Sequence, residues 1–181
     1  MAAANLFRQR GYRDVSIAEL EKATGLVSGS IYNAFGDKAG LFRAALDHYV
    51  HGFVGQRLDA FAGEDATLED LEGLFLSVLE PPLADGHGCL VTNSIVEFGR
   101  GGEMASDGVA AALAMVREGV GGVLERELGA EAAAAETVRL LVLYHGILAL
   151  SRSPTPFAEM AQAVKSEFSR LRQLRDRAAA P

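Results

Sequence analysis

Apolar residues recur at intervals of three and four along almost the whole chain, which is the spacing of amphipathic α-helices. Glycine and proline separate these apolar runs, and a serine, threonine or aspartate stands before several of them, as at helix N-termini. Alternating strand patterns are nearly absent. We therefore expect an all-α protein of about nine helices, at residues 1–10, 16–23, 28–34, 37–61, 67–79, 89–98, 104–128, 131–151 and 157–177.

Helix ends are marked most clearly in the first forty residues. Ser16 is followed three residues later by Glu19, which is the pattern of a capping box. Glycines close the first three expected helices, at Gly11, Gly25 and Gly36. The two short helices at 16–23 and 28–34 are separated only by the turn Thr24–Val27. This arrangement is typical of a helix-turn-helix, whose second helix enters the major groove of DNA.

The sequence of the second short helix, SGSIYNAF, suits a recognition helix. Ile31 and Phe35 lie four residues apart and face the core, so the remaining positions face outward. Hydroxyl and amide groups there can bond to phosphates or base edges, and glycine permits close approach. Each outward residue alone is ordinary solvated surface, but together they favour DNA binding. The predicted DNA contacts are Ser28, Gly29, Ser30, Tyr32, Asn33 and Lys38.

Lys38 is included because a cation in the first turn of a helix opposes the helix dipole. A bound phosphate would explain it, since the phosphate gains both the ammonium group and the free amides of the helix N-terminus.

The segment LFRQRGYRDVSIAELEKATGLVSGSIYNAFGDKAGLFRAALDHY resembles the DNA-binding domain of TetR/AcrR-type transcriptional regulators. The matching positions are Phe7, Gly11, Tyr12, Ser16, Ile17, Leu20, Ala23, Gly25, Gly29, Ser30, Ile31, Tyr32, Phe35, Lys38 and Leu41. The resemblance covers about the first quarter of the chain. It implies a homodimer, usually a repressor, that binds a palindromic operator and releases it when a small molecule enters the C-terminal domain. By position it implies DNA contacts at Ser28, Ser30, Tyr32 and Asn33, with Tyr32 and Lys38 on phosphates.

Two positions depart from the family pattern. Members usually carry a further turn or more of helix, with a basic arm, before the position of Met1. Either the sequence starts late relative to the natural protein, or Met1 is the true start and the phosphate affinity of such an arm is lost. Val27 replaces the small polar cap that is common before the recognition helix. We therefore expect Ser28 to shift into the capping role.

The resemblance divides the chain into a helix-turn-helix domain at 1–48 and a ligand-binding and dimerisation domain at 49–181. The last two helices are the expected dimer surface, because two copies of such a pair can pack as a four-helix bundle about a two-fold axis. Their small and apolar positions include Ala134, Val138, Leu141, Val142, His145, Ala149, Phe157, Met160, Ala161, Val164, Phe168, Leu171 and Leu174. The alternative is that these stripes form only the monomer core. A two-fold operator favours the dimer.

The stretch HGCLVTNSIVEF mixes polar and apolar residues and is the expected wall of an effector pocket. The predicted ligand-binding residues are Phe75, Cys89, Asn93, Phe98, Met115, Tyr144 and His145, with Met104 nearby. His145 can instead be a hydrogen-bonded core histidine. Cys89, two residues after His87, can be a redox sensor or simply a small buried apolar residue.

Charge and cysteine content narrow the classes that remain. The formal net charge is −7, which argues against a nucleic-acid coat or a polybasic membrane binder. Residues 1–50 nevertheless carry six basic and five acidic side chains, so this part can face a polyanion. One cysteine excludes an internal disulfide, and the apolar stretch Leu140 to Leu150 is too short to span a bilayer. We expect a cytoplasmic protein without membrane attachment.

Enzymatic signals are weak, and we expect no catalytic residue, metal or cofactor. Cys89 with His87 or His145 lacks the surroundings of a nucleophile–base pair. The glycines at 99–102 and 119–122 do not form a nucleotide-binding motif, and His48 with His51 lacks further metal ligands. Two alternatives stay open. One is a small-molecule-binding or enzymatic helical domain with a vestigial DNA-binding segment; the other is a purely structural dimerisation module.

Overall fold

The computed structural model describes residues 1–99 and 104–178, and every regular element within those ranges is helical. The prediction of an all-α fold is therefore confirmed. The helices are α1 (Ala2–Arg10), α2 (Ile17–Thr24), α3 (Ser28–Phe35), α4 (Lys38–His48), α5 (Gly55–Phe61), α6 (Leu68–Leu76), α7 (Leu90–Phe98), α8 (Ser106–Leu128), α9 (Ala130–Leu150) and α10 (Phe157–Ala178).

Short irregular helices fill some of the gaps. A π-helical segment, Tyr49–Val54, joins α4 to α5 without a break, so the helix expected at 37–61 is one continuous rod. Short 3₁₀ turns at Ser77–Leu79 and Leu83–Asp85 follow α6. Of the glycines expected to end the helix at 98, Gly99 caps α7 with a φ of 61°, whereas Gly101 and Gly102 lie outside the described residues.

The helix ends of the N-terminal segment follow the predicted capping chemistry, with one exception. Ser16 and Glu19 form the capping box of α2, and the Asp37 side chain accepts a 2.7 Å hydrogen bond from the N–H of Gly40. The expected shift of Ser28 into capping is wrong, because Val27 occupies the cap position of α3. The carboxylate of Glu21 reaches across the turn and accepts a hydrogen bond from the N–H of Ser28, which supplies the acceptor that Val27 lacks.

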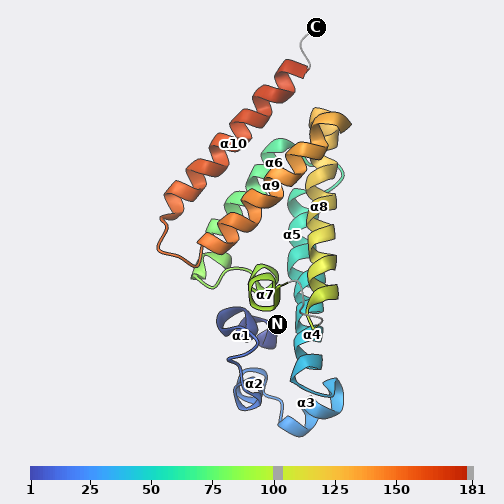
Figure 1. Cartoon of the computed structure of the whole chain (residues 1–181), viewed down its shortest axis with the longest axis vertical. Coiled ribbons are helices and arrows are strands. Elements are labelled where there is room, and N and C mark those ends of the chain that lie inside the picture. Colours follow the sequence, from blue (N-terminus) through green and yellow to red (C-terminus); the bar gives the residue numbers. More distant parts are fainter. Residues whose placement is uncertain (100–103, 179–181) are drawn as a thin grey trace.

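The helices build two packed regions that share α4 (Figure 1). Helices α1, α2 and α3 gather around the start of α4 at one end of the molecule. Helices α8 and α9 pack along each other, and α10 lies mainly against α6, with its C-terminal end at the opposite end of the molecule. Helix α7 contacts both α1 and α9, so it stands where the two regions meet.

Helix α9 carries the longest apolar stretch of the chain. The stretch Leu140 to Leu150 was judged too short to span a bilayer, but the whole helix of 21 residues is long and apolar enough to cross a membrane by length and composition alone. It packs along α8, and 39% of its most apolar window is buried inside the fold. A core helix has the same properties, so α9 by itself does not indicate a membrane protein.

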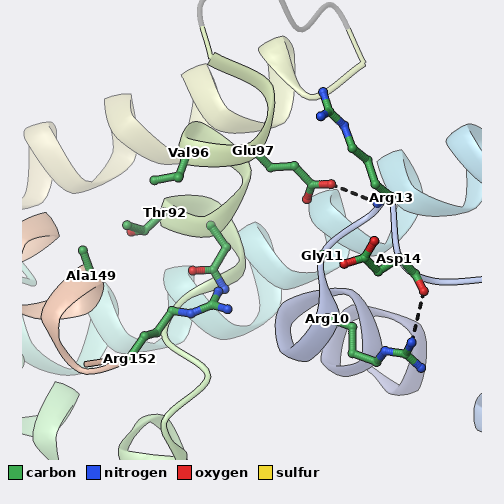
Figure 2. A pocket seen from close by; sticks show the side chains of 10 residues that line it. Arg10, Gly11, Arg13, Asp14, Thr92, Val96, Glu97, Ala149 and Arg152 are labelled. Carbon is green, nitrogen blue, oxygen red and sulfur yellow. Dashed lines mark hydrogen bonds between the residues drawn. The ribbon is translucent and has the colours of Figure 1, made fainter. Parts of the chain in front are cut away.

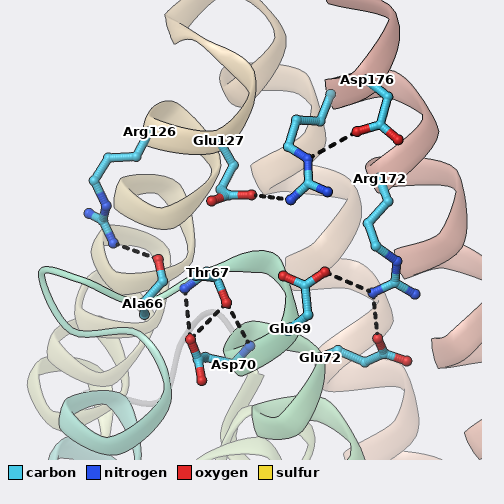
Figure 3. A network of polar contacts seen from close by, with 10 residues as sticks. Ala66, Thr67, Glu69, Asp70, Glu72, Arg126, Glu127, Arg172 and Asp176 are labelled. Atoms are coloured by element: carbon cyan, nitrogen blue, oxygen red, sulfur yellow. Dashed lines mark hydrogen bonds and ion pairs between the residues drawn. The ribbon is translucent and has the colours of Figure 1, made fainter. Parts of the chain in front are cut away.

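Arginines on α10 hold this helix against the rest of the body (Figure 3). Arg172 lies 2.7 Å from a carboxylate oxygen of Glu72 on α6, and Arg175 lies 2.8 Å from one of Glu127 on α8. Arg170 pairs with Glu136 of α9, whose side chain is only 10% exposed. Although each partly exposed pair contributes little by itself, pairs to three helices fix the direction in which α10 leaves the body.

Candidate nucleic-acid interface

The outer face of α3 is held at the surface by a small buried anchor. Ile31 on the inner face of α3 and Leu20 on α2 are both fully buried, whereas Phe35 is half-buried. These three side chains fix the rotation of α3 about its own axis. The remaining side chains of the helix therefore point away from the core.

The residues predicted to contact DNA share this exposed face. A Cβ atom placed on Gly29 would have no heavy atom within 4 Å, and the side chain of Tyr32 is 48% exposed. Ser30 and Asn33 are exposed, while Ser28 is half-buried beside Glu21. The structure thus brings five of the six predicted residues together on one short helix, and their DNA contacts stay a prediction.

The turn before α3 presents two apolar side chains that the sequence reasoning did not select. Val27 is 65% exposed and Leu26 is 41% exposed, which is unusual for side chains of this type. Both flank the start of α3. Apolar side chains at this position can contact thymine methyl groups in the major groove. Their place inside the four-residue turn was the signal available in the sequence.

Lys38, the sixth predicted contact, turns toward the protein rather than into open solvent. Its Nζ atom lies 4.3 Å from the centre of the Tyr12 ring and 3.5 Å from the carbonyl oxygen of Arg13. The ammonium group therefore sits beside the turn between α1 and α2. The cation–π contact at a partly exposed site contributes only about 0.5–1 kcal/mol, so a phosphate can compete for this cation.

An aromatic cluster joins the N-terminal end to α7. Tyr12 packs against Phe42 with ring centres 5.3 Å apart, and Phe98 lies 5.8 Å from Tyr12 and 5.5 Å from Phe42. Phe7 packs edge-on against Phe42 at 5.0 Å. Phe98, which the sequence suggested as a pocket residue, thus lies between the two regions.

Hydrogen bonds from α7 fix the end of α1 and the turn that follows it. Both carboxylate oxygens of Glu97 accept bonds at 2.9 Å, one from the N–H of Tyr12 and the other from the N–H of Arg13. The side-chain amide of Asn93 donates to the carbonyl oxygens of Arg8 at 3.0 Å and His87 at 2.9 Å. Asn93 was also predicted to line the effector pocket. Its amide faces Arg8 at the N-terminal end, the side chain also borders a recess there, and a part in ligand binding stays a prediction.

Arg8 of α1 adds further bonds to this contact of α1 with α7 and its preceding loop, which is here called the junction. Although charged, it is only 6% exposed, and its guanidinium group forms an ion pair with Asp85 and donates a 2.9 Å bond to the carbonyl oxygen of Gly88. Sequence reasoning missed Arg8. The available signal was its position on the buried face of α1, four residues after Ala4 and next to Phe7.

The Arg8–Asp85 pair predicts a pH-dependent part of the stability. The hydrogen bond from Arg8 lowers the pKa of Asp85 below its usual value. Since an unfolded aspartate has a pKa of about 3.9, this stabilisation is present above that pH and is lost as the pH falls through the lower pKa of the folded state. We expect D85N to lower the free energy of unfolding at pH 7 by about 1 kcal/mol, because the pair is partly exposed.

Urea unfolding followed by circular dichroism between pH 3 and 7 measures this effect. The difference in the free energy of unfolding between D85N and the unsubstituted protein should shrink as the pH falls below 4. D59N, at an exposed site on α5, should have the same free energy of unfolding as the unsubstituted protein at every pH. A gap that stays constant down to pH 3 would contradict the assignment.

Removing the Glu97 carboxylate should loosen the junction. E97A leaves the N–H groups of Tyr12 and Arg13 without their side-chain acceptor, so we expect a loss of about 2 kcal/mol in the free energy of unfolding. Hydrogen exchange should accelerate at those two amides. E118A, at an exposed site on α8, is the matched control and should change neither quantity. Unchanged exchange at Tyr12 and Arg13 in E97A would rule out the role given to Glu97.

Three of the predicted effector residues surround a small internal cavity of about 20 Å³. Cys89, Tyr144 and His145 line it together with apolar side chains of α8 and the π segment. Phe75 packs on Tyr144 with ring centres 5.1 Å apart, and Met115 lies next to Gly55. A cavity of this size has room for about one water molecule.

Met104 lies elsewhere, in a separate recess of about 180 Å³ beside α4 that also includes Arg43 and Asp107. The predicted effector residues therefore occupy several places, and a common ligand site stays a prediction.

Burial shifts the pKa values of two polar side chains around the small cavity. Burial lowers the pKa of His145, which favours its neutral form at pH 7, and it raises the pKa of Tyr144 to about 12. The Nδ1 atom of His145 lies 3.1 Å from Oγ1 of Thr92, while its buried Nε2 has no hydrogen-bond partner among the described residues. Tyr49 donates a 3.6 Å bond to the Sγ atom of Cys89, which is 7% exposed.

Within residues 1–99 and 104–178, no group of three or more histidine, cysteine or acidic side chains is placed to hold a metal ion. His51 lies on the exposed side of the π segment, where its Nδ1 atom is 3.2 Å from a carboxylate oxygen of Asp47.

Comparison with known proteins agrees with the geometry of the N-terminal end. The sequence model of the family described as "Bacterial regulatory proteins, tetR family" matches residues 1–45. A segment of 67 residues is 39% identical to the HTH-type transcriptional repressor ComR of Escherichia coli (strain K12). That segment makes up 37% of this chain and 32% of ComR, so the match spans about a third of the relative.

Solved structures extend the likeness to the whole fold. A TetR family regulator from Cytophaga hutchinsonii superposes with a TM-score of 0.79 at 20% identity, covering 95% of this chain and 90% of its own. A cysteine mutant of the TetR family regulator CifR, solved with a 26-bp double-strand operator DNA, superposes with a TM-score of 0.78 at 22% identity. That match covers 93% of this chain and 92% of CifR.

The fold and the exposed α3 define a helix-turn-helix protein with an attached helical body. Residues 1–45 in particular match the TetR family of bacterial regulatory proteins. The family resemblance read from the sequence is thereby confirmed.

Proposed function

We propose that this protein is a transcriptional regulator, acting as a repressor, that binds a palindromic operator as a homodimer in the cytoplasm. One observation carries the proposal: α3 follows α2 after a short turn and presents Gly29, Ser30, Tyr32 and Asn33 on an exposed face. The family match to residues 1–45 supports the same function. In this scheme residues 1–48 bind DNA, and residues 49–181 form the dimer and bind an effector.

The dimer is proposed to form through α9 and α10. Three valine and leucine side chains of α9 are left at the surface, with Val138 48%, Val142 70% and Leu150 46% exposed. Exposed apolar side chains gathered on one helix indicate an interaction surface. A second copy packed there about a two-fold axis would present two α3 helices to one duplex, about 34–36 Å apart.

The effector is proposed to act through the junction made by Glu97, Asn93 and Arg8. These groups bond α7 and its preceding loop directly to the end of α1. A ligand that displaces α7 would move the helix-turn-helix with it. The ligand changes DNA affinity only if it binds the two arrangements with different strength.

The proposal predicts opposite effects of G29A on stability and on DNA binding. Because nothing lies within 4 Å of the added methyl group, alanine should stabilise α3 by up to about 1 kcal/mol. If α3 lies against base edges, the same methyl group should weaken binding to DNA at least fivefold.

A gel-shift assay with the upstream region of the protein's own gene measures binding, and Y32A should weaken it while R117A, at an exposed site on α8, should not. If K38A and Y32A together leave all activity unchanged, the chain is instead a small-molecule-binding helical protein with a vestigial DNA-binding segment.

A further inference from the structure

A second recess lies between the helix-turn-helix end and the body, outside the internal cavity (Figure 2). It has a volume of about 530 Å³, which lies in the range of small-molecule sites. Its walls come from the end of α1 and the following turn, from α7, and from the end of α9. We propose that this recess, here named the junction pocket, binds a small carboxylic acid with an apolar body, and that Arg152 is the partner of the carboxylate.

Besides Arg10, the charged side chains that line the junction pocket are Arg13, Arg152, Asp14 and Glu97, so the preference for an anion rests on the position of Arg152 and not on net charge. Both oxygens of Glu97 are already used by the backbone N–H groups of Tyr12 and Arg13, and Arg10 is paired with Glu19. The guanidinium group of Arg152 is exposed and has no hydrogen-bond or ion-pair partner among the described residues. An unpaired guanidinium in a concave site is suited to bind a carboxylate with two parallel hydrogen bonds.

The position of Arg152 is set by packing rather than by an acidic neighbour. It follows the end of α9, and its aliphatic stem lies over Gly88, where an added Cβ would come within 3.0 Å of the arginine Cδ. Figure 2 shows the side chain extending from the end of α9 toward α7 and α1. Asp14, the other acidic side chain of the pocket besides Glu97, lies on the opposite side from Arg152.

The wall next to Arg152 combines the polar side chains of Thr92 and Asn93 with two apolar ones, and the apolar part selects among anions. Val96 on α7 is 79% exposed and Ala149 on α9 is also exposed, and both line the junction pocket on the side of Arg152. An acid with an aromatic or branched aliphatic body gains by covering these side chains, whereas a small inorganic anion does not. The structure therefore favours a carboxylic acid over a free phosphate.

Because the junction pocket lies between the helix-turn-helix and the body, a bound acid would change DNA affinity. This step rests on the proposed function. An acid bound here would touch α7 and α9 on one side and the turn after α1 on the other, beside the bonds from Glu97 to that turn. It would therefore favour one arrangement of the helix-turn-helix relative to the body. By linkage, DNA and the acid must then change each other's affinity by the same factor.

Isothermal titration of the full chain with benzoate tests the site, with benzamide as the neutral analogue of the same shape. We expect one saturable site per chain for benzoate, no saturable binding of benzamide, and at least tenfold weaker binding of benzoate to R152Q. R117Q, at an exposed site on α8, is the matched control and should bind as the unsubstituted protein does. Absence of saturable benzoate binding, equal binding of benzamide, or equal binding to R152Q would each overturn the proposal.

The same samples separate this inference from the proposed function. Binding of a labelled duplex is measured by fluorescence anisotropy without benzoate. DNA binding without benzoate binding leaves the regulator intact and removes the junction pocket as a site. Benzoate binding that depends on Arg152, in a protein that binds no DNA, would keep the site and remove the regulator.

Discussion

Replacing Val142 with glutamate is expected to convert the proposed dimer into monomers and to weaken operator binding at least 100-fold. Val142 is 70% exposed on α9, so the substitution leaves the core of one chain unchanged. In the dimer it would bury a charge at an apolar contact in each copy, and an unpaired buried carboxylate is strongly unfavourable. A monomer contacts only one half-site of a two-fold operator, so the binding contacts at the other half-site are lost.

Sedimentation velocity and DNA anisotropy on the same sample measure both effects. A114E, which places the same charge on the exposed side of α8, is the matched control and should remain dimeric with unchanged affinity. The interface assignment fails if V142E sediments as the unsubstituted protein does, whatever its DNA affinity.

The second large effect is expected from G40A, which should lower the free energy of unfolding by about 3 kcal/mol. A Cβ atom at Gly40 would lie 1.9 Å from the carbonyl oxygen of Phe35, and a backbone atom cannot move aside as a side-chain tip can. The connection from α3 to α4 would have to open. Overpacking of this kind typically costs about 1–3 kcal/mol. The upper end applies here because the clash is with a backbone atom.

Urea unfolding of G40A and G29A side by side measures this effect. Both place one methyl group on a helix of the helix-turn-helix segment, but only Gly40 meets a neighbour. We expect opposite signs for the two. Equal stabilities would show that α4 begins with a different geometry from the one described.

Much of the fold was predictable because its signals are local. Ser16, Asp37 and Thr67 cap helices where the sequence predicts them, and Gly11 and Gly25 adopt the positive φ angles that end helices. The π segment was not predicted. Apolar spacing continues through it, so the pattern reads as one uninterrupted α-helix, and the change in hydrogen bonding appears only in the structure.

The candidate sites likewise divide into those set by local sequence signals and those set by contacts between distant residues. The outer face of α3 follows from helical spacing once Ile31 is assigned to the core. Asn93 and Phe98 were placed in an effector pocket on residue type alone, yet their partners, Arg8 and Tyr12, lie more than eighty residues earlier in the chain. Spacing along one helix carries no information about such contacts. The same holds for Arg152, whose isolation depends on which acidic groups fold near it.

Selection from a pool of random double-stranded DNA by the purified full-length protein tests the central claim most directly. The account predicts enrichment of an inverted repeat whose half-sites are centred about one or two helical turns apart, and loss of that enrichment with Y32A. Failure to enrich any sequence at low salt, or enrichment of a sequence without two-fold symmetry, would contradict it.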